Sequence, residues 1–356
     1  MRLELSPRAN ITPLMRLAAP IAALVLAFAI AAIVIAFYGK SPLQAFDVYI
    51  VGSLSDSWAL QELLVKATPL ILIAIGLSYC FRSNLWNIGA EGQFVIGGLF
   101  GGWIAIATHG GEWSLVWPYV LLVGAVAGAV YGFIPAILKV RFGANEILTS
   151  LMLVNIAQLF LDYMVRGPLK DPKGMNFPQS VTFEDAALLP KVFGSDRVHF
   201  GLILAIIVVL ITMVIVSRSI FGYRLRITGD APKAASFAGF SSKTTTIIVF
   251  CISGALAGLA GASEVAGQIG QLQPTISPGY GFSAVTVAFL GRLHPVGIVL
   301  SALVLAMVMI GGENAQIMLK LPLDLTTAFQ GLLLLIVLSA DALVSYKFRI
   351  VRGRRG

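Results

Sequence analysis

Nine polar side chains within or beside apolar runs are the residues of this sequence whose types could do chemistry. Three are carboxylates and six are amides: Asn87, Glu91, Gln93, Glu146, Asn155, Gln158, Glu264, Gln268 and Gln271. A charged group at the centre of a bilayer costs on the order of 2–3 kcal/mol unless it faces protein or water, so such groups mark paths or contacts. Carboxylates and amides in these places can bind protons or ions, or hydrogen-bond a polar solute. We therefore take all nine as candidates for a translocation path.

Helical spacing places several of these candidates on shared faces. At about 100° per residue, one stripe holds Ser253, Ala257, Ala260, Glu264, Gln268 and Gln271. This stripe is small at one end and polar at the other, which suits either a packing seam or the lining of a path. Around 147–165 one face holds Asn155, Gln158 and Asp162, and the opposite face holds Glu146, Thr149 and Ser150. That pattern predicts a helix whose two ends line different cavities.

Other kinds of chemistry lack their residues in this sequence. A phosphate-binding loop needs GxxxxGK[ST], and no such string occurs, so the chain alone is not expected to use ATP. His109, His199 and His294 stand singly in predicted loops, and we interpret them as solvated. No cluster suggests a metal site or a nucleophile with its base. We expect no catalytic residue, no metal site and no cofactor in this chain.

Composition identifies the solvent in which these residues must be positioned. The chain has 356 residues, of which 58% are hydrophobic and 12% charged, with a mean hydropathy of +0.89. A soluble domain carries about 25% charged residues, so the solvent is lipid. The net charge is +8, and the basic residues gather at the ends of the predicted helices and in short loops. This distribution indicates orientation in a membrane rather than binding of nucleic acid.

Ten apolar runs predict an all-α polytopic membrane protein with about ten transmembrane helices. The runs are 17–38, 63–81, 93–108, 116–138, 147–165, 200–217, 244–266, 280–291, 295–312 and 325–346. The eighth is short, so runs eight and nine could form a hairpin that does not fully cross. Gly124, Gly128 and Gly132, and likewise Gly254 and Gly258, are four residues apart, which predicts close packing of two helices.

Loops rich in Lys and Arg alternate along the chain with loops of balanced charge. This alternation predicts that both termini are cytoplasmic. We expect one membrane-spanning domain over 1–356, with a membrane core at 17–346, an external loop at 166–199 and a cytoplasmic loop at 217–243. In the last of these, Asp230 before Ala231-Pro232 predicts an N-cap. A short helix would then end at Gly239. This helix is either an ordered loop or a docking element for a soluble partner.

The spacing in the 217–243 loop resembles the coupling loop of permease subunits of ABC importers for sugars, nucleosides and branched-chain amino acids. The matching residues are Phe221, Gly222, Arg226, Gly229, Ala234, Ala235, Ala238 and Gly239, with Asp230 beside them. Asn-Ile-Gly-Ala-Glu-Gly-Gln at 87–93 resembles the signature of the nucleoside and simple-sugar branch. Asn-Glu-Ile-Leu-Thr-Ser-Leu-Met-Leu at 145–153 resembles its second motif. The resemblance covers about residues 60–345.

The resemblance implies a division of labour among several chains of a bacterial inner-membrane importer. An extracytoplasmic binding protein captures a nucleoside or sugar, and this chain pairs with a homologous permease or with a second copy of itself. A partner ATPase binds ATP and Mg²⁺ and docks on the coupling loop, where Ala235→Glu or Gly239→Arg should block contact. The alternative is a stand-alone secondary transporter in which Glu91, Glu146 and Glu264 bind protons or ions.

Overall fold

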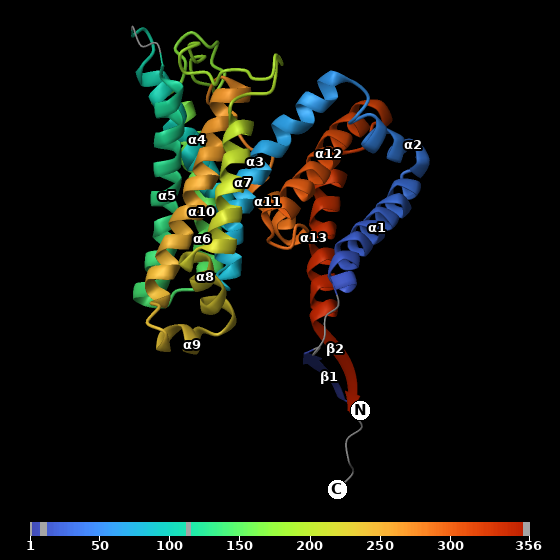
Figure 1. Ribbon diagram of the computed structural model, residues 1–356. Coiled ribbons are helices and arrows are strands. Elements are labelled where there is room, and N and C mark those ends of the chain that lie inside the picture. Colours follow the sequence, from blue (N-terminus) through green and yellow to red (C-terminus); the bar gives the residue numbers. More distant parts are fainter. Residues whose placement is uncertain (1, 8–12, 112–114, 352–356) are drawn as a thin grey trace. The chain divides into compact units, whose positions relative to one another are not determined.

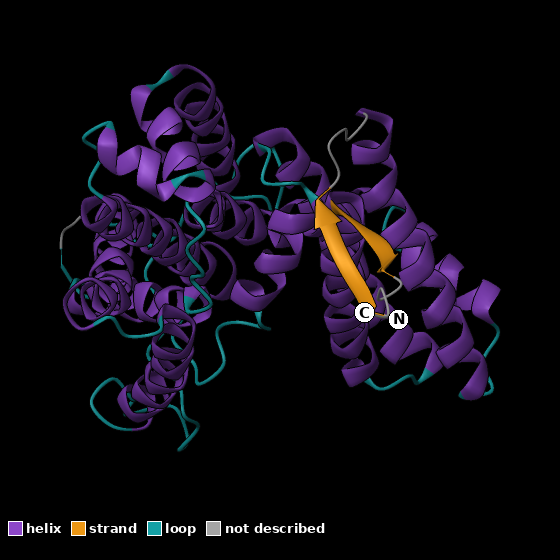
Figure 2. Cartoon of the chain, turned by 90° about the horizontal axis from the view of Figure 1, so that it is seen from below, coloured by secondary structure: helices purple, strands orange, loops and turns teal. Residues whose placement is uncertain are grey.

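The computed structural model describes residues 2–7, 13–111 and 115–351, and almost all of its ordered elements are helices (Figures 1 and 2). Nine helices among these residues are long and apolar enough to cross a membrane. They are α1 (Pro13–Phe37), α3 (Ser57–Arg82), α4 (Ala90–Ala107), α5 (Trp117–Phe142), α6 (Glu146–Arg166), α7 (Gly201–Arg218), α10 (Ser242–Glu264), α12 (Pro295–Leu319) and α13 (Leu323–Ser345). The all-α polytopic fold class is thereby confirmed.

The eighth apolar run forms α11 (Tyr280–Leu290), which has 11 residues. A helix needs about 20 residues to cross the hydrocarbon core, so α11 is a partial span. The ninth run, α12, has 25 residues and is long enough to cross. The prediction that the eighth run falls short is confirmed, whereas the ninth has the length of a full span.

The chain divides into two compact units, residues 1–55 with 307–356, and residues 56–306. The first contains α1, α2 (Pro42–Phe46), the π-helical η1 (Asp47–Val51), α13 and the end of α12. Here α1 packs against α13. The strands β1 (Arg2–Pro7) and β2 (Tyr346–Val351) pair antiparallel, with Arg2 opposite Val351 (Figure 2). This pairing places the two strands on the same side, as two cytoplasmic termini would require, and which side that is stays a prediction.

In the second unit α10 packs against α3, α4 and α5. The contact with α5 depends on the predicted glycines, because a Cβ on Gly128 would collide with the carbonyl oxygen of Gly254. Close backbone approach of this kind holds helices together in lipid, where no hydrophobic effect does so. The prediction of close packing from the four-residue spacing is confirmed.

Two connecting segments lie at opposite ends of this helical bundle (Figure 1). The first is the loop between α6 and α7, residues 167–200, whose Val198 packs with Val65 near the start of α3. The second is the helix pair α8 (Ile220–Asp230) and α9 (Pro232–Phe237), where a Cβ on Gly229 would collide with the carbonyl oxygen of Arg82 at the end of α3. A 26-residue helix is about 39 Å long. The two segments are therefore a membrane thickness apart.

Candidate functional site

The first motif forms a closed polar network at the start of α4. The Asn87 amide donates to Gln93 Oε1 at 2.9 Å and to Ser253 Oγ of α10 at 3.0 Å, and Gln93 Nε2 donates to Asn87 Oδ1 at 3.1 Å. All three side chains are buried. Buried polar groups are stable only when hydrogen-bonded, so Asn87 and Gln93 serve here to tie the entry of α4 to α10.

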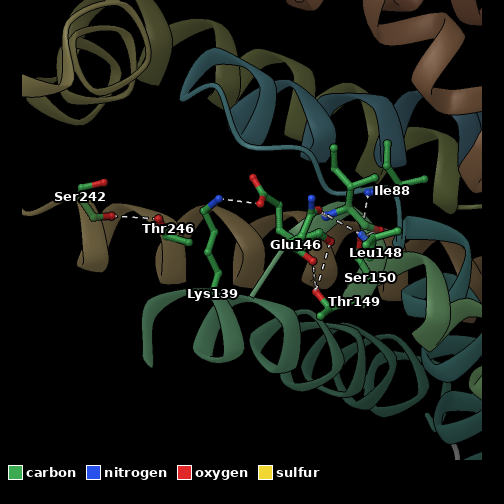
Figure 3. Close-up of polar contacts among 10 residues, drawn as sticks. Ile88, Lys139, Glu146, Leu148, Thr149, Ser150, Ser242 and Thr246 are labelled. Atoms are coloured by element: carbon green, nitrogen blue, oxygen red, sulfur yellow. Dashed lines mark hydrogen bonds and ion pairs between the residues drawn. The ribbon is translucent and has the colours of Figure 1, made fainter. Parts of the chain in front are cut away.

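The second motif starts α6 and ends in an ion pair. Asn145 caps the helix, its Oδ1 accepting from the backbone N–H groups of Ile147 and Leu148 at 2.9 and 3.3 Å. The Lys139 ammonium of α5 lies 2.6 Å from the Glu146 carboxylate, and Figure 3 shows the two side chains pointing toward each other. Glu146 is therefore neutralised by a neighbouring helix.

The two motifs touch each other. Ser150 Oγ of α6 accepts from the Ile88 N–H at 3.2 Å. A Cβ on Gly89 would lie 2.8 Å from both the Cβ and the carbonyl oxygen of Ser150, and one on Gly92 would lie 3.0 Å from Val154 Cα. The glycines of the first motif are needed because α6 leaves no room for a side chain at these points.

A polar cavity of about 580 Å³ lies between α4, α6 and the segment that leads into α11. Three predicted path residues, Glu91, Asn155 and Gln158, line it together. Its other lining residues are Val95, Leu159, Leu161, Asp162, Arg166, Pro274, Thr275 and Ser277. Sequence analysis missed Thr275 and Ser277, although Ser277 before Pro278-Gly279 and an apolar run is a helix-start signal.

Glu91 also holds the start of α11. Its Oε2 accepts from the Gly281 N–H at 2.6 Å, and Ser277 Oγ accepts from the N–H groups of Gly279 and Tyr280 at 3.1 Å each. The first N–H groups of a helix have no partner within the helix, and water does not reach them in hydrocarbon. Glu91 and Ser277 supply these partners at the cavity wall.

Two of the three charged side chains that line the cavity pair with each other. Arg166 Nε lies 2.7 Å from Asp162 Oδ1 and 2.8 Å from Oδ2, one turn apart on α6. Arg166 is the one cation among the described lining residues, and this pair neutralises it. The Glu91 carboxylate, which accepts from the Gly281 N–H, remains together with amides and hydroxyls, and this lining suits an uncharged polar solute better than an anion.

The remaining predicted path residues lie elsewhere. Glu264 is buried at the end of α10, among charged residues of α3 and of the 167–200 loop, and is not among the residues that line this cavity. Gln268 belongs to the π-helical η2 (Val265–Ile269), and Gln271 Nε2 lies 3.5 Å from Gln179 Oε1 of the loop. Whether these three residues line another part of a path stays a prediction.

The loop also buries a histidine that sequence analysis interpreted as solvated. His199 is buried against Gly267 of η2 and Gly201 of α7. Burial lowers the pKa of His199 to about 4, with a smaller contribution from the charge of Lys191. The interpretation was wrong for His199, because the backbone of the loop folds onto η2 through the bond from Leu189 N–H to Ala266 O at 2.9 Å.

The predicted coupling loop forms two helices rather than one. Ser219 caps α8 by accepting from the Gly222 N–H at 3.0 Å, and α8 continues through Asp230. Asp230 is therefore the last residue of α8 and not the N-cap of α9, whose first residue is Pro232 as predicted. Gly239, with a φ of +82°, follows the end of α9 as expected of a glycine in the left-handed conformation.

The coupling-loop residues point in two directions. Gly222 and Ala235 are buried, and Gly229 packs on α3, so these three face the chain itself. The exposed positions are Arg226, Asp230, Ala234 and Gly239, together with Phe237, whose side chain is 93% exposed. Ala235→Glu would therefore disturb the fold of this segment, and the substitution does not isolate docking.

Comparison with known proteins identifies the family of this chain. The family model described as "Branched-chain amino acid transport system / permease component" matches residues 59–338. The chain belongs to this family.

Three relatives of this permease are named for the transport of a sugar or a nucleoside. It is 34% identical to the glucose ABC transporter permease protein TsgB13 of Haloferax volcanii, over 100% of this chain and 96% of the relative. It is 31% identical to the guanosine ABC transporter permease protein NupP of Bacillus subtilis, over 96% and 97% of the two chains. The nucleoside permease NupB of Lactococcus lactis is 29% identical over 83% of each chain. No solved structure matches.

The protein is thus a multi-pass inner-membrane permease subunit of an ABC importer, of the sugar and nucleoside branch. Its relatives are transport permeases rather than enzymes, and membership implies an ATPase and a solute-binding protein as partners. The matches favour this reading over the alternative of a stand-alone secondary transporter.

Proposed function

We propose that the permease forms one half of a path for a small uncharged polar solute, a sugar or a nucleoside. The observation that carries this proposal is the cavity of about 580 Å³ lined by Asn155, Gln158 and Ser277. Amides and hydroxyls both donate and accept hydrogen bonds, so they can replace the water that a polyhydroxylated solute loses. The names of the relatives, which include glucose and guanosine, support the same class of solute.

A second permease chain, homologous or identical, completes the path. Asn155 and Gln158 are exposed on α6, a membrane-spanning helix of which only 22% is buried within the chain. Facing lipid, two amides in a span would lack partners at a cost of roughly 1–3 kcal/mol each. A facing permease chain with water between the two removes that cost, and the space between them becomes the path.

The energy comes from a partner. The chain carries no phosphate-binding loop, so the ATP and Mg²⁺ that drive transport bind to an ATPase that docks on the exposed surface of α8 and α9. At the other end of the bundle, the 167–200 loop receives the solute-binding protein. Arg224 holds α8 to α10 through bonds of 2.7 Å to Thr245 Oγ1 and 3.0 Å to the Ser241 carbonyl. Movement of α8 driven by the ATPase is thereby passed to α10.

Uptake of radiolabelled sugar and nucleoside by the complete complex in proteoliposomes tests the lining of the path. Asn155→Leu combined with Gln158→Leu should lower uptake at least tenfold, because a desolvated hydroxyl then finds no partner. Asn155→Gln keeps the amide and should retain most of the uptake. Ile156→Leu, which alters the apolar groove on another face of α6, is the matched control. Normal uptake by the double Leu variant would contradict the proposal.

A further inference from the structure

Four charged side chains gather beneath the 167–200 loop, away from the cavity; three of them are buried and Arg197 is partly exposed. Arg197 of the loop lies 2.6 Å from Glu62 of α3 and stacks over the Trp58 ring at 5.2 Å. Lys66 follows one turn after Glu62, and Glu264 of α10 lies within range of the charges of all three. Glu62, Lys66 and Glu264 are all buried.

Burial of charged side chains costs free energy of folding. Replacing buried ion pairs by apolar residues is often neutral or stabilising, so a buried ionic cluster is weak evidence for stability. Ionisable residues within membrane spans are, by contrast, a common mark of function. Two acids and two bases also balance in charge, which argues against a site for a metal cation. The cluster of Glu62, Lys66, Arg197 and Glu264 is therefore better explained by a functional role than by a contribution to stability.

The cluster reaches the cavity through one side chain. The Tyr280 hydroxyl lies within hydrogen-bonding range of the Glu264 carboxylate, and Oε2 of that carboxylate is buried without a hydrogen-bond partner. Tyr280 is the first residue of α11, and its ring lies 5.8 Å from that of Phe94 in α4. Its own backbone N–H is bonded to Ser277 and that of the next residue, Gly281, to Glu91, and both Ser277 and Glu91 line the cavity.

A series of neighbouring charged and polar side chains thus leads from the loop to the cavity wall. It passes from Arg197 to Glu62 and Lys66 of α3, then to Glu264, and then to Tyr280 at the start of α11. We propose that Glu264 and Tyr280 are positioning residues that couple the 167–200 loop to the start of α11, where the cavity lining begins. Docking of a solute-loaded binding protein on the loop then sets the cavity for solute. This inference rests on the proposed function of the cavity.

The test compares variants at the two ends of the series in the full complex of permeases, ATPase and binding protein. Tyr280→Phe removes the hydroxyl and keeps the ring packed on Phe94, and Arg197→Gln removes the ion pair on the loop. Each should lower the ATP hydrolysis stimulated by the loaded binding protein at least fivefold, with basal hydrolysis unchanged. The double variant should be no worse than either single variant, because coupled residues are not additive.

Two further variants separate positioning from simple support of the fold. Arg197→Lys keeps a cation near Glu62 and should restore at least half of the stimulation. Asp196→Asn removes the neighbouring charge, which is exposed and lies outside the cluster, and should leave stimulation unchanged. A purely structural role would lower basal and stimulated hydrolysis together, in step with the melting temperature, and that result would overturn the inference.

Additive effects of the two single variants, or full stimulation in both, would also overturn the inference while the wild-type complex still responds to solute. Absence of solute stimulation in the wild-type complex itself would instead overturn the proposed function. The two failures are therefore distinguishable within one set of measurements.

Discussion

The exposed ring of Phe237 gives the most direct test of ATPase docking on α8 and α9. It is the most exposed large apolar side chain of those that the structure describes, at 93%, and it ends α9. A phenylalanine side chain presents about 150–250 Å², and apolar burial contributes about 25 cal/mol per Å². Complete burial of this ring in a groove of the ATPase would therefore contribute at most about 4–6 kcal/mol.

Phe237→Ala should lose a substantial part of this contribution. Interface positions that dominate binding lose 2 kcal/mol or more on truncation, and 2 kcal/mol corresponds to about a 30-fold weaker affinity. The assay is equilibrium binding of labelled ATPase to the permease pair in lipid nanodiscs. The melting temperature of the permease should not change, because the ring contacts little of its own chain.

Phe177→Ala is the matched control. Phe177 is 63% exposed in the 167–200 loop, at the opposite end of the bundle, so its truncation should leave ATPase affinity within twofold of wild type. If Phe237→Ala also stayed within threefold, or if both variants weakened binding equally, the assignment of α9 as the docking helix would be refuted.

Three further predictions concern packing, protonation and topology. Gly89→Ala should lower the free energy of unfolding by about 1–3 kcal/mol through overpacking. Gly331→Ala should leave the free energy of unfolding unchanged, because a Cβ at that position meets nothing within 4 Å. Thermal unfolding measures both variants. Burial lowers the pKa of His199 from 6.5 to about 4. The stability that depends on a neutral His199 is therefore fully present above pH 6.5, and up to about 3 kcal/mol of the free energy of unfolding is lost as the pH falls from 6.5 to 4. His199→Gln should flatten this dependence of the melting temperature on pH. Cysteine at Lys173 should react with an impermeant thiol reagent added to intact cells, and cysteine at Arg226 only after lysis; the reverse labelling would overturn the orientation.

The helices were predictable from sequence because lipid allows few alternatives. Every backbone polar group of a span must be bonded within the span, so an apolar run such as 147–165 becomes a helix, here Glu146–Arg166. The short α11 was predictable for a related reason, since Arg292, His294 and Pro295 close its apolar run. The glycine spacing likewise predicted close helix packing, although it did not identify α5 and α10 as partners.

Side-chain partners from distant segments were not predictable in the same way. Helical periodicity placed Glu264 on a polar stripe, but nothing in that stripe identifies Arg197 or Lys66 as its neighbours. The same limit applies to Glu146, whose partner Lys139 lies on the preceding helix. Three candidates that did meet, Glu91, Asn155 and Gln158, share a cavity because α4 and α6 touch through the glycines of the first motif.

Local signals also failed where tertiary contacts extended an element. Asp230-Ala231-Pro232 has the form of a helix start, yet α8 runs on through Asp230. Ser219 starts that helix, and Gly229 lets its last turn approach the end of α3. A contact with another helix thus decided which of two possible caps is used.

Transport by the reconstituted complex tests the central claim most directly. Proteoliposomes should contain the permease with its partner permease, its ATPase and its binding protein, and the measurement is ATP hydrolysis together with uptake of sugar and nucleoside. The account predicts that loaded binding protein stimulates hydrolysis and drives uptake, and that the permease alone does neither. Concentrative uptake by the permease alone, driven by a proton or sodium gradient, would contradict it.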